Sequence, residues 1–130
     1  MTEYGPDWHT IDFRVYYEDT DAGGIVYHAN YLQFAERART EMLRALGNEN
    51  RIMQEEDGIL IIVRALQASY NKPAYLDDLV TVASTVRQMK YSSLVMRQDI
   101  LRGNQLIFSM EITLVCIDLK GRPVRLPDIL

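Results

Sequence analysis

Three acidic side chains stand close together just before a pair of glycines. They are Glu18, Asp19 and Asp21, followed by Gly23 and Gly24. A carboxylate can attack a carbonyl carbon or deprotonate a water molecule, and glycines let the backbone come close to a ligand. The segment therefore has the residue types that chemistry at a carbonyl group requires.

A helix is predicted to begin soon after these glycines. Apolar residues recur at three- and four-residue steps from Tyr31 to Leu46, and Asn30 is suited to be the N-cap. The first backbone N–H groups of a helix are unpaired and lie at the positive end of its dipole, where they could stabilise an oxyanion. Acids before a helix more often act as caps or dipole partners, so the residues alone leave both interpretations open.

The other elements must position this segment. Alternating apolar side chains predict a strand over 11–17, and 51–57 is expected to be a short second helix or an irregular segment. The order of one strand, one long helix and then four strands indicates an α+β fold, in which an antiparallel sheet of about five strands is wrapped around the helix. The four later strands are predicted over 59–70, 79–88, 92–101 and 105–119.

Length and composition indicate a single globular domain, 1–130, with a loosely ordered N-terminal extension over 1–10. The formal net charge of −4 argues against a nucleic-acid-binding protein. Neither a secretory signal nor an apolar stretch long enough to cross a bilayer is recognisable. We therefore expect a cytoplasmic protein without a transmembrane segment.

Cysteine and histidine are scarce. Cys116 is the only cysteine, which excludes a disulfide within the chain, and His9 and His28 are the only imidazoles. None of the familiar metal-ligand spacings occurs, so we expect neither a metal site nor a cofactor. A small sheet has exposed edges, and pairing such edges between subunits is one way to cover them, so a homo-oligomer is expected.

A continuous segment, 14–43, carries a family resemblance. It reads R-V-Y-Y-E-D-T-D-A-G-G-I-V-Y-H-A-N-Y-L-Q-F-A-E-R-A-R-T-E-M-L. It closely resembles the 4-hydroxybenzoyl-CoA thioesterase family, and within it the acyl-CoA thioesterases encoded with the bacterial Tol–Pal envelope system. The resemblance continues through 74–78 and 89–95 and covers about 13–127. It implies the hotdog fold and the hydrolysis of acyl-CoA thioesters to a free acid and CoA.

The resemblance also implies roles for individual residues. The family's catalytic aspartate precedes the A-G-G step, which corresponds to Asp21 rather than Asp19. His28 matches the residue whose backbone N–H polarises the thioester carbonyl, and its side chain is expected to orient water or to protonate the leaving thiolate. Expected substrate-binding residues are Gly24, Ile25 and Tyr27 in the loop, and Lys90, Ser92 and Ser93, which fall where the family contacts the CoA nucleotide. Candidate walls of the acyl pocket, which would form between subunits, are Ile25, Val26, Leu32, Phe34 and 61–63.

Several alternatives remain at this stage. Asp21 could act as a nucleophile or as a general base, and Glu36 on the helix is a weaker candidate for the catalytic acid. The acid–histidine arrangements of hotdog hydratases and the G-x-S-x-G segment of serine hydrolases are both missing. A non-catalytic module that senses acyl-CoA or acyl-carrier protein is the main rival. Acyl-chain preference, CoA versus acyl-carrier protein, and dimer versus dimer of dimers stay open.

Overall fold

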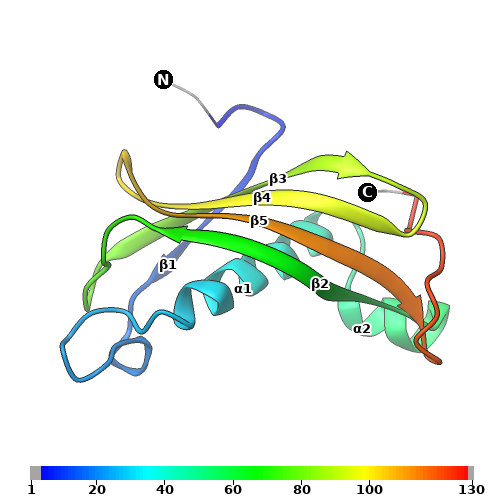
Figure 1. Ribbon diagram of the computed structural model, residues 1–130, viewed down its shortest axis with the longest axis horizontal. Coiled ribbons are helices and arrows are strands. Elements are labelled where there is room, and N and C mark those ends of the chain that lie inside the picture. Colours follow the sequence, from blue (N-terminus) through cyan, green and yellow to red (C-terminus); the bar gives the residue numbers. More distant parts are fainter. Residues whose placement is uncertain (1–3, 129–130) are drawn as a thin grey trace.

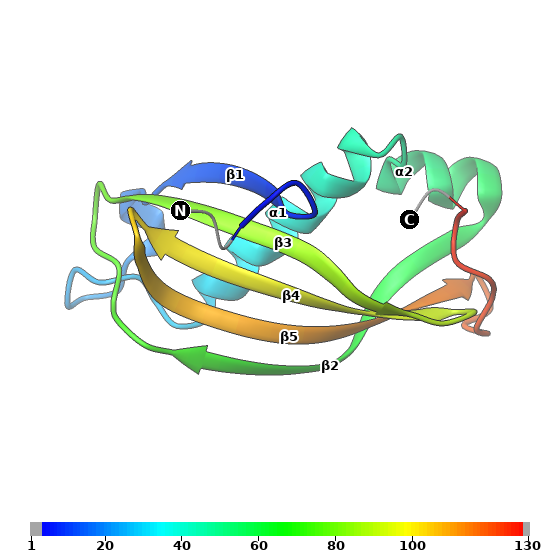
Figure 2. The same ribbon diagram turned by 90° about the horizontal axis from the view of Figure 1, so that it is seen from above.

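The computed structural model describes residues 4–128. A five-stranded sheet in the order β1-β3-β4-β5-β2, antiparallel at every pairing, wraps over one long helix, α1 (Figures 1 and 2). This is the α+β arrangement that the order of elements predicts. The strands are β1 (His9–Arg14), β2 (Ile59–Tyr70), β3 (Leu79–Met89), β4 (Ser93–Arg102) and β5 (Gln105–Asp118). The helical segments are η1 (Tyr17–Asp19), α1 (Asn30–Ala45), α2 (Asn50–Ile52) and η2 (Met53–Asp57).

The core lies between α1 and the sheet face that it covers. Phe34, Ala35, Ala38 and Met42 recur at helical spacing and are buried, as the periodicity predicts. Every second residue of each central strand points toward them, because side chains alternate between the faces of a sheet. These strand residues are Val80, Val82, Leu94, Met96, Ile100, Phe108, Met110 and Ile112.

Two boundaries around the acidic segment differ from those predicted. The first strand begins at His9 and ends at Arg14, instead of running from 11 to 17. The Asp19 carboxylate accepts a hydrogen bond from the Tyr16 N–H at 2.8 Å, which turns the chain away from the sheet. Asn30 is the first residue of α1 and not its N-cap, a position that Ala29 occupies. Its side chain instead donates to Asp19 Oδ1 at 3.1 Å.

The N-terminal segment lies on the opposite face of the sheet from α1 (Figure 1). Of the loosely ordered extension expected over 1–10, residues 1–3 lie outside the described residues. Tyr4 packs edge-on against Trp8, and its hydroxyl donates to the buried Asp99 carboxylate at 2.7 Å. His9 and Thr10 belong to β1, where they pair with residues of β3. Backbone pairing and aromatic contacts therefore hold the part of this extension that the structure describes.

The two ends of the sheet carry different loops. At one end, the segment that links β1 to α1 meets the connection between β2 and β3, through Val26 N–H donating to Ala74 O at 2.9 Å. At the other end lies the β3–β4 turn, where Tyr91 O accepts from the Leu126 N–H. β3 runs from one end to the other over eleven residues, about 35 Å at roughly 3.3 Å per residue. Within one chain, loops at opposite ends of the sheet are therefore too far apart to form a small site together.

Phe108 offers a test of the core at the end that carries the acidic loop. It is fully buried and lies between Tyr31, with ring centroids 5.4 Å apart, and Tyr70, at 5.1 Å. Phe108→Ala should lower the free energy of unfolding by about 3–5 kcal/mol, because it removes a buried ring and leaves a cavity. Urea denaturation measures this loss. Tyr91→Ala, at an exposed position, is the matched control and should stay within about 0.5 kcal/mol of wild type.

Candidate active site

The loop that carries the acidic residues is a small hairpin with Asp21 at its tip. Thr20 and Val26 form an antiparallel bridge, and Asp21 N–H donates to Ile25 O at 2.9 Å. Gly24 N–H then closes the turn on Asp21 O at 3.0 Å. Gly24 has a φ of +79°, a conformation that residues with a side chain rarely adopt, which is why a glycine stands there.

The Asp21 carboxylate is exposed and is oriented by the backbone of its own turn. Its Oδ1 accepts a hydrogen bond from the Gly23 N–H at 2.9 Å. A Cβ atom added at Gly23 would come within 3.3 Å of that same oxygen. A side chain at this position would therefore press on the carboxylate, so Gly23 leaves Asp21 both a donor and the space it needs.

Asp19 has a different environment, although it stands only two residues earlier. Its side chain is 4% exposed and accepts from Tyr16 N–H and Asn30 Nδ2. Its carbonyl oxygen accepts from Tyr27 N–H at 3.0 Å. Asp19 thus ties the end of the first strand, the hairpin loop and the start of α1 together. A buried carboxylate occupied in this way is a structural residue, in agreement with the choice of Asp21 as the candidate catalytic acid.

His28 lies where the loop joins α1. Among the described residues, the backbone N–H groups of His28 and Ala29 donate to no protein acceptor. These free donors stand at the positive end of the helix dipole, so the position can stabilise a carbonyl oxygen that gains negative charge. The His28 side chain is exposed, with its ring centroid 4.5 Å from that of Tyr27.

Tyr70, at the end of β2, is a site residue that the sequence did not reveal. Its hydroxyl donates to the His28 carbonyl oxygen at 3.0 Å, and its ring packs edge-on against the rings of His28 and Phe108. It holds the peptide between His28 and Ala29 from the side of the sheet. The two residues lie 42 positions apart, and no local spacing relates them, so only the folded chain brings them together.

The remaining predicted site residues divide between the two ends of the molecule. Gly24, Ile25 and Tyr27 lie in the hairpin loop beside Asp21 and His28, as expected from their sequence positions. Residues 90–93 lie at the β3–β4 turn, at the far end of the sheet (Figure 1). Within one chain, Lys90, Ser92 and Ser93 therefore do not lie with Asp21, because the full length of β3 separates them.

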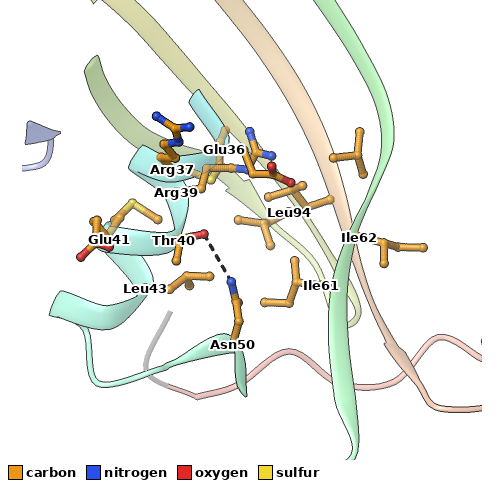
Figure 3. A pocket seen from close by; sticks show the side chains of 14 residues that line it. Glu36, Arg37, Arg39, Thr40, Glu41, Leu43, Asn50, Ile61, Ile62 and Leu94 are labelled. Atoms are coloured by element: carbon orange, nitrogen blue, oxygen red, sulfur yellow. Dashed lines mark hydrogen bonds between the residues drawn. The ribbon is translucent and has the colours of Figure 1, made fainter. Parts of the chain in front are cut away.

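A groove between α1 and β2 contains two adjacent cavities, which share three lining residues. Figure 3 shows the side chains that line the larger of these two cavities. The inner cavity, about 200 Å³, begins at the first turn of α1, and the outer cavity, about 510 Å³, extends to the end of that helix. Glu36, Arg39 and Val63 line both. The inner cavity is completed by Leu32, Gln33, Leu66, Met110 and Ile112, and the outer one includes Thr40, Leu43, Asn50, Ile61, Ile62, Leu94, Met96 and Leu114.

Some of the residues predicted to form the acyl pocket line this groove, and others do not. Leu32 and 61–63 line the groove, whereas Val26 and Phe34 are buried in the core and contribute to neither cavity. Ile25 stays in the hairpin loop, where it forms a bridge with Tyr75. Glu36, the alternative catalytic acid, lines the groove on α1 two turns beyond His28. Asp21 stands in the hairpin loop that leads into the free N–H groups at the start of α1, whereas Glu36 lies on the helix in the groove.

No group of three or more potential metal-ligating side chains occurs among residues 4–128. In the same part of the chain, no helix has the length and apolar character needed to span a membrane.

Residues 15–130 match the profile of the thioesterase-like superfamily. The chain is 43% identical over 115 residues to the acyl-CoA thioesterase YbgC of Haemophilus influenzae, covering 88% of this chain and 85% of that protein. It is 45% identical over 116 residues to the acyl-CoA thioester hydrolase YbgC of Escherichia coli O6:H1, covering 88% of this chain and 86% of that protein. The crystal structure of a probable thioesterase from Bartonella henselae superimposes with a TM-score of 0.89 at 34% identity, covering 92% of this chain and 99% of that one.

Asp19→Ala tests the separation of structural and chemical roles in the loop. It removes the acceptor of two hydrogen bonds at a buried position, so the free energy of unfolding should fall by about 1–3 kcal/mol. Asp21→Ala, at the exposed tip, is the matched control and should change stability by less than about 0.5 kcal/mol. Thermal denaturation of the two variants makes the comparison. Equal stability losses would contradict the assignment of Asp19 as the residue that holds the loop.

Proposed function

The chain belongs to the thioesterase-like superfamily, and we propose that it hydrolyses acyl-CoA thioesters to a free acid and CoA, with Asp21 as the catalytic carboxylate. The observation that carries this proposal is the pairing, in one small loop, of an exposed carboxylate with free N–H groups at a helix start. Relatives at 43% and 45% identity that are named as acyl-CoA thioesterases support the same reaction.

The chemistry follows from these two features. The thioester carbonyl oxygen lies against the His28 N–H, and the developing negative charge is stabilised by that donor and by the helix dipole. Asp21 either attacks the carbonyl carbon or deprotonates the attacking water. In the first route the tetrahedral intermediate expels the thiolate and leaves an acyl–aspartyl anhydride, which water then hydrolyses to the free acid and the Asp21 carboxylate. The His28 imidazole orients water or protonates the departing thiolate. Both routes need the same placement of Asp21 and the same N–H donor.

A second copy of the chain completes the site in this proposal. β2 is an edge strand of twelve residues, and Ile62, Val63, Leu66 and Tyr70 on it are 42–49% exposed. Such an exposed apolar edge is suited to antiparallel pairing with its own copy around a two-fold axis. The dimer, alone or paired into a tetramer, would cover this edge.

Two-fold pairing also resolves the separation of the predicted substrate contacts. β2 begins opposite Asp118, at the end of the sheet that carries the β3–β4 turn. It ends at Tyr70, whose hydroxyl donates to the His28 carbonyl oxygen at the other end of the sheet. Because paired antiparallel copies run in opposite directions, the turn of one copy lies near the hairpin loop of the other. We therefore propose that Asp21 and His28 of one protomer act together with Lys90, Ser92 and Ser93 of its partner, with Lys90 pairing with a phosphate of CoA.

The proposed setting is cytoplasmic, with acyl-CoA as substrate and acyl-carrier protein as the alternative carrier of the acyl group. A role beside the Tol–Pal envelope system, and membership of the 4-hydroxybenzoyl-CoA subgroup, are supported by the sequence resemblance over 14–43.

Asp21→Asn is the direct test of the reaction. Removing the carboxylate should lower kcat by at least about 10³-fold while acyl-CoA binding is retained, because the amide can neither attack nor accept a proton at neutral pH. Free-thiol release from short, long and aromatic acyl-CoAs measures kcat. Cys116 is fully buried, and burial raises the pKa of its thiol, so the protein itself should not react with the thiol reagent in the assay.

Asp57→Asn is the matched control for this experiment, because it makes the same change at an exposed residue at the end of η2, away from the hairpin loop and the helix start. If the wild type binds acyl-CoA but hydrolyses none of the thioesters, the hydrolase proposal is wrong and the non-catalytic sensing module is favoured.

Complementation between subunits tests the shared site. Asp21→Asn and Lys90→Glu are each expected to be weakly active alone, the first in chemistry and the second through a raised KM. In a co-expressed mixture, about half of the dimers are hybrid, and one of their two sites has both native residues, so about a quarter of wild-type activity should return. Activity no higher than the mean of the two separate variants would show that Asp21 and Lys90 do not meet across an interface.

A further inference from the structure

The chain just before α1 forms a tight turn whose central N–H groups are free. Asn30 N–H donates to Tyr27 O at 2.8 Å, which makes His28 and Ala29 the two central residues of a four-residue turn. Ala29 has a φ of −70° and a ψ of −21°, close to the conformation of a helix. The N–H groups of these two residues donate to no protein acceptor among the described residues, and N–H groups at a helix start point in similar directions. The turn therefore presents two adjacent donors.

The peptide group between His28 and Ala29 is held from the sheet. The carbonyl oxygens of the peptides before and after it accept backbone N–H groups of α1, at 2.8 and 3.2 Å. The His28 carbonyl oxygen accepts instead from the Tyr70 hydroxyl at 3.0 Å. A side chain from another element therefore fixes the orientation of the peptide that carries the Ala29 N–H.

The planarity of the peptide group transmits this contact to the free donor. A peptide group is planar and trans, so its C=O and N–H bonds point in opposite directions. A hydroxyl that fixes the direction of the His28 carbonyl therefore also fixes the direction of the Ala29 N–H. The same hydrogen bond polarises the amide, because hydrogen bonds in a chain strengthen one another. Tyr70 thus acts on a donor that it does not touch.

Tyr70 is itself anchored in the core. Its backbone pairs with Phe108 of β5, and its ring packs edge-on against the rings of Phe108 and Tyr31, with centroids 5.1 and 5.5 Å apart. Both of these neighbours are buried. The position of the hydroxyl against the His28 carbonyl oxygen is therefore set by the packing of the core.

We propose that the Ala29 N–H is a second donor to the oxyanion and that Tyr70 is the positioning residue that orients it. This inference rests on the proposed thioesterase function and deepens it, because it adds a donor to the His28 N–H. The oxyanion of the tetrahedral intermediate carries more charge than the carbonyl oxygen of the bound thioester. Two aligned donors therefore stabilise the transition state more than the bound substrate, and a loss of alignment should affect kcat rather than KM.

Tyr70→Phe tests this role, because it removes only the hydroxyl and keeps the ring in its packing. Removing an oxyanion donor outright costs about 10²–10³-fold in kcat, so releasing its orientation should lower kcat by about tenfold. KM should stay within about twofold of the wild-type value. Free-thiol release from acyl-CoA gives both constants, and the midpoint of urea denaturation shows that the variant is folded. A purely structural role would lower the urea midpoint and leave kcat of the folded enzyme unchanged.

Tyr4→Phe is the matched control, since it also removes one hydroxyl that donates a hydrogen bond. Its acceptor is the buried Asp99 carboxylate at 2.7 Å, and Tyr4 lies on the opposite face of the sheet from α1 (Figure 1). This variant should lower the urea midpoint and leave kcat and KM unchanged. The two variants thus separate the loss of a hydroxyl contact from the loss of orientation at the turn.

Nuclear magnetic resonance observes the two donors directly. The probe is a ketone analogue of butyryl-CoA in which a methylene group replaces the sulfur atom, so that it keeps the carbonyl oxygen and cannot be hydrolysed. Its addition to the wild type should move the amide proton signals of both His28 and Ala29 downfield. In Tyr70→Phe the His28 signal should still move, and the shift of the Ala29 signal should be much smaller.

The outcomes separate this inference from the proposed function. If the wild type hydrolyses acyl-CoA but Tyr70→Phe keeps the wild-type kcat, or if the analogue leaves the Ala29 signal in place, the second donor is wrong and the hydrolase proposal stands. If the wild type hydrolyses no thioester, the hydrolase proposal is wrong and the Ala29 signal alone decides. A downfield shift that Tyr70→Phe reduces would then support the donor pair, and the absence of a shift would overturn it.

Discussion

The buried carboxylate of Asp19 is the contact on which the geometry of the proposed site depends. It accepts hydrogen bonds from the backbone where the first strand ends and from the Asn30 side chain where α1 begins. Its carbonyl oxygen holds the second arm of the hairpin loop through Tyr27. Each carboxylate oxygen accepts one of these bonds, whereas an asparagine would present an amide N–H group to one of the two donors. One residue therefore sets the position of the loop tip relative to the helix start.

The sheet supports that arrangement from the other side. Tyr70, at the end of β2, bonds to the His28 carbonyl oxygen and packs on Phe108, which in turn stacks on Tyr31 of α1. The start of α1 therefore lies between the hairpin loop and an aromatic cluster of Tyr31, Tyr70 and the buried Phe108. Rigid support of this kind is what an oxyanion site needs, because its donors must already point at the place where charge develops.

The groove between α1 and β2 begins near the start of the same helix. Leu32 on α1 and Val63 on β2, both predicted walls of the acyl pocket, line its smaller cavity. The exposed apolar edge of β2 borders the groove, so pairing with a second copy would also cover the acyl group.

The sequence by itself determined the α+β order and the apolar stripe of α1, because periodic patterns are local properties. The resemblance over 14–43 is also carried by a contiguous motif, and it is the basis of the prediction that Asp21 is the catalytic carboxylate. Tertiary structure decided the rest. The sequence pattern predicts Asn30 as an N-cap, but in the folded chain its side chain donates to Asp19, eleven positions away. Tyr70 gains its role only through His28, 42 positions away, and no spacing in the sequence encodes such a contact. The predicted site residues at 90–93 share a motif with the family but lie at the far end of the sheet, because strands turn sequence distance into spatial separation.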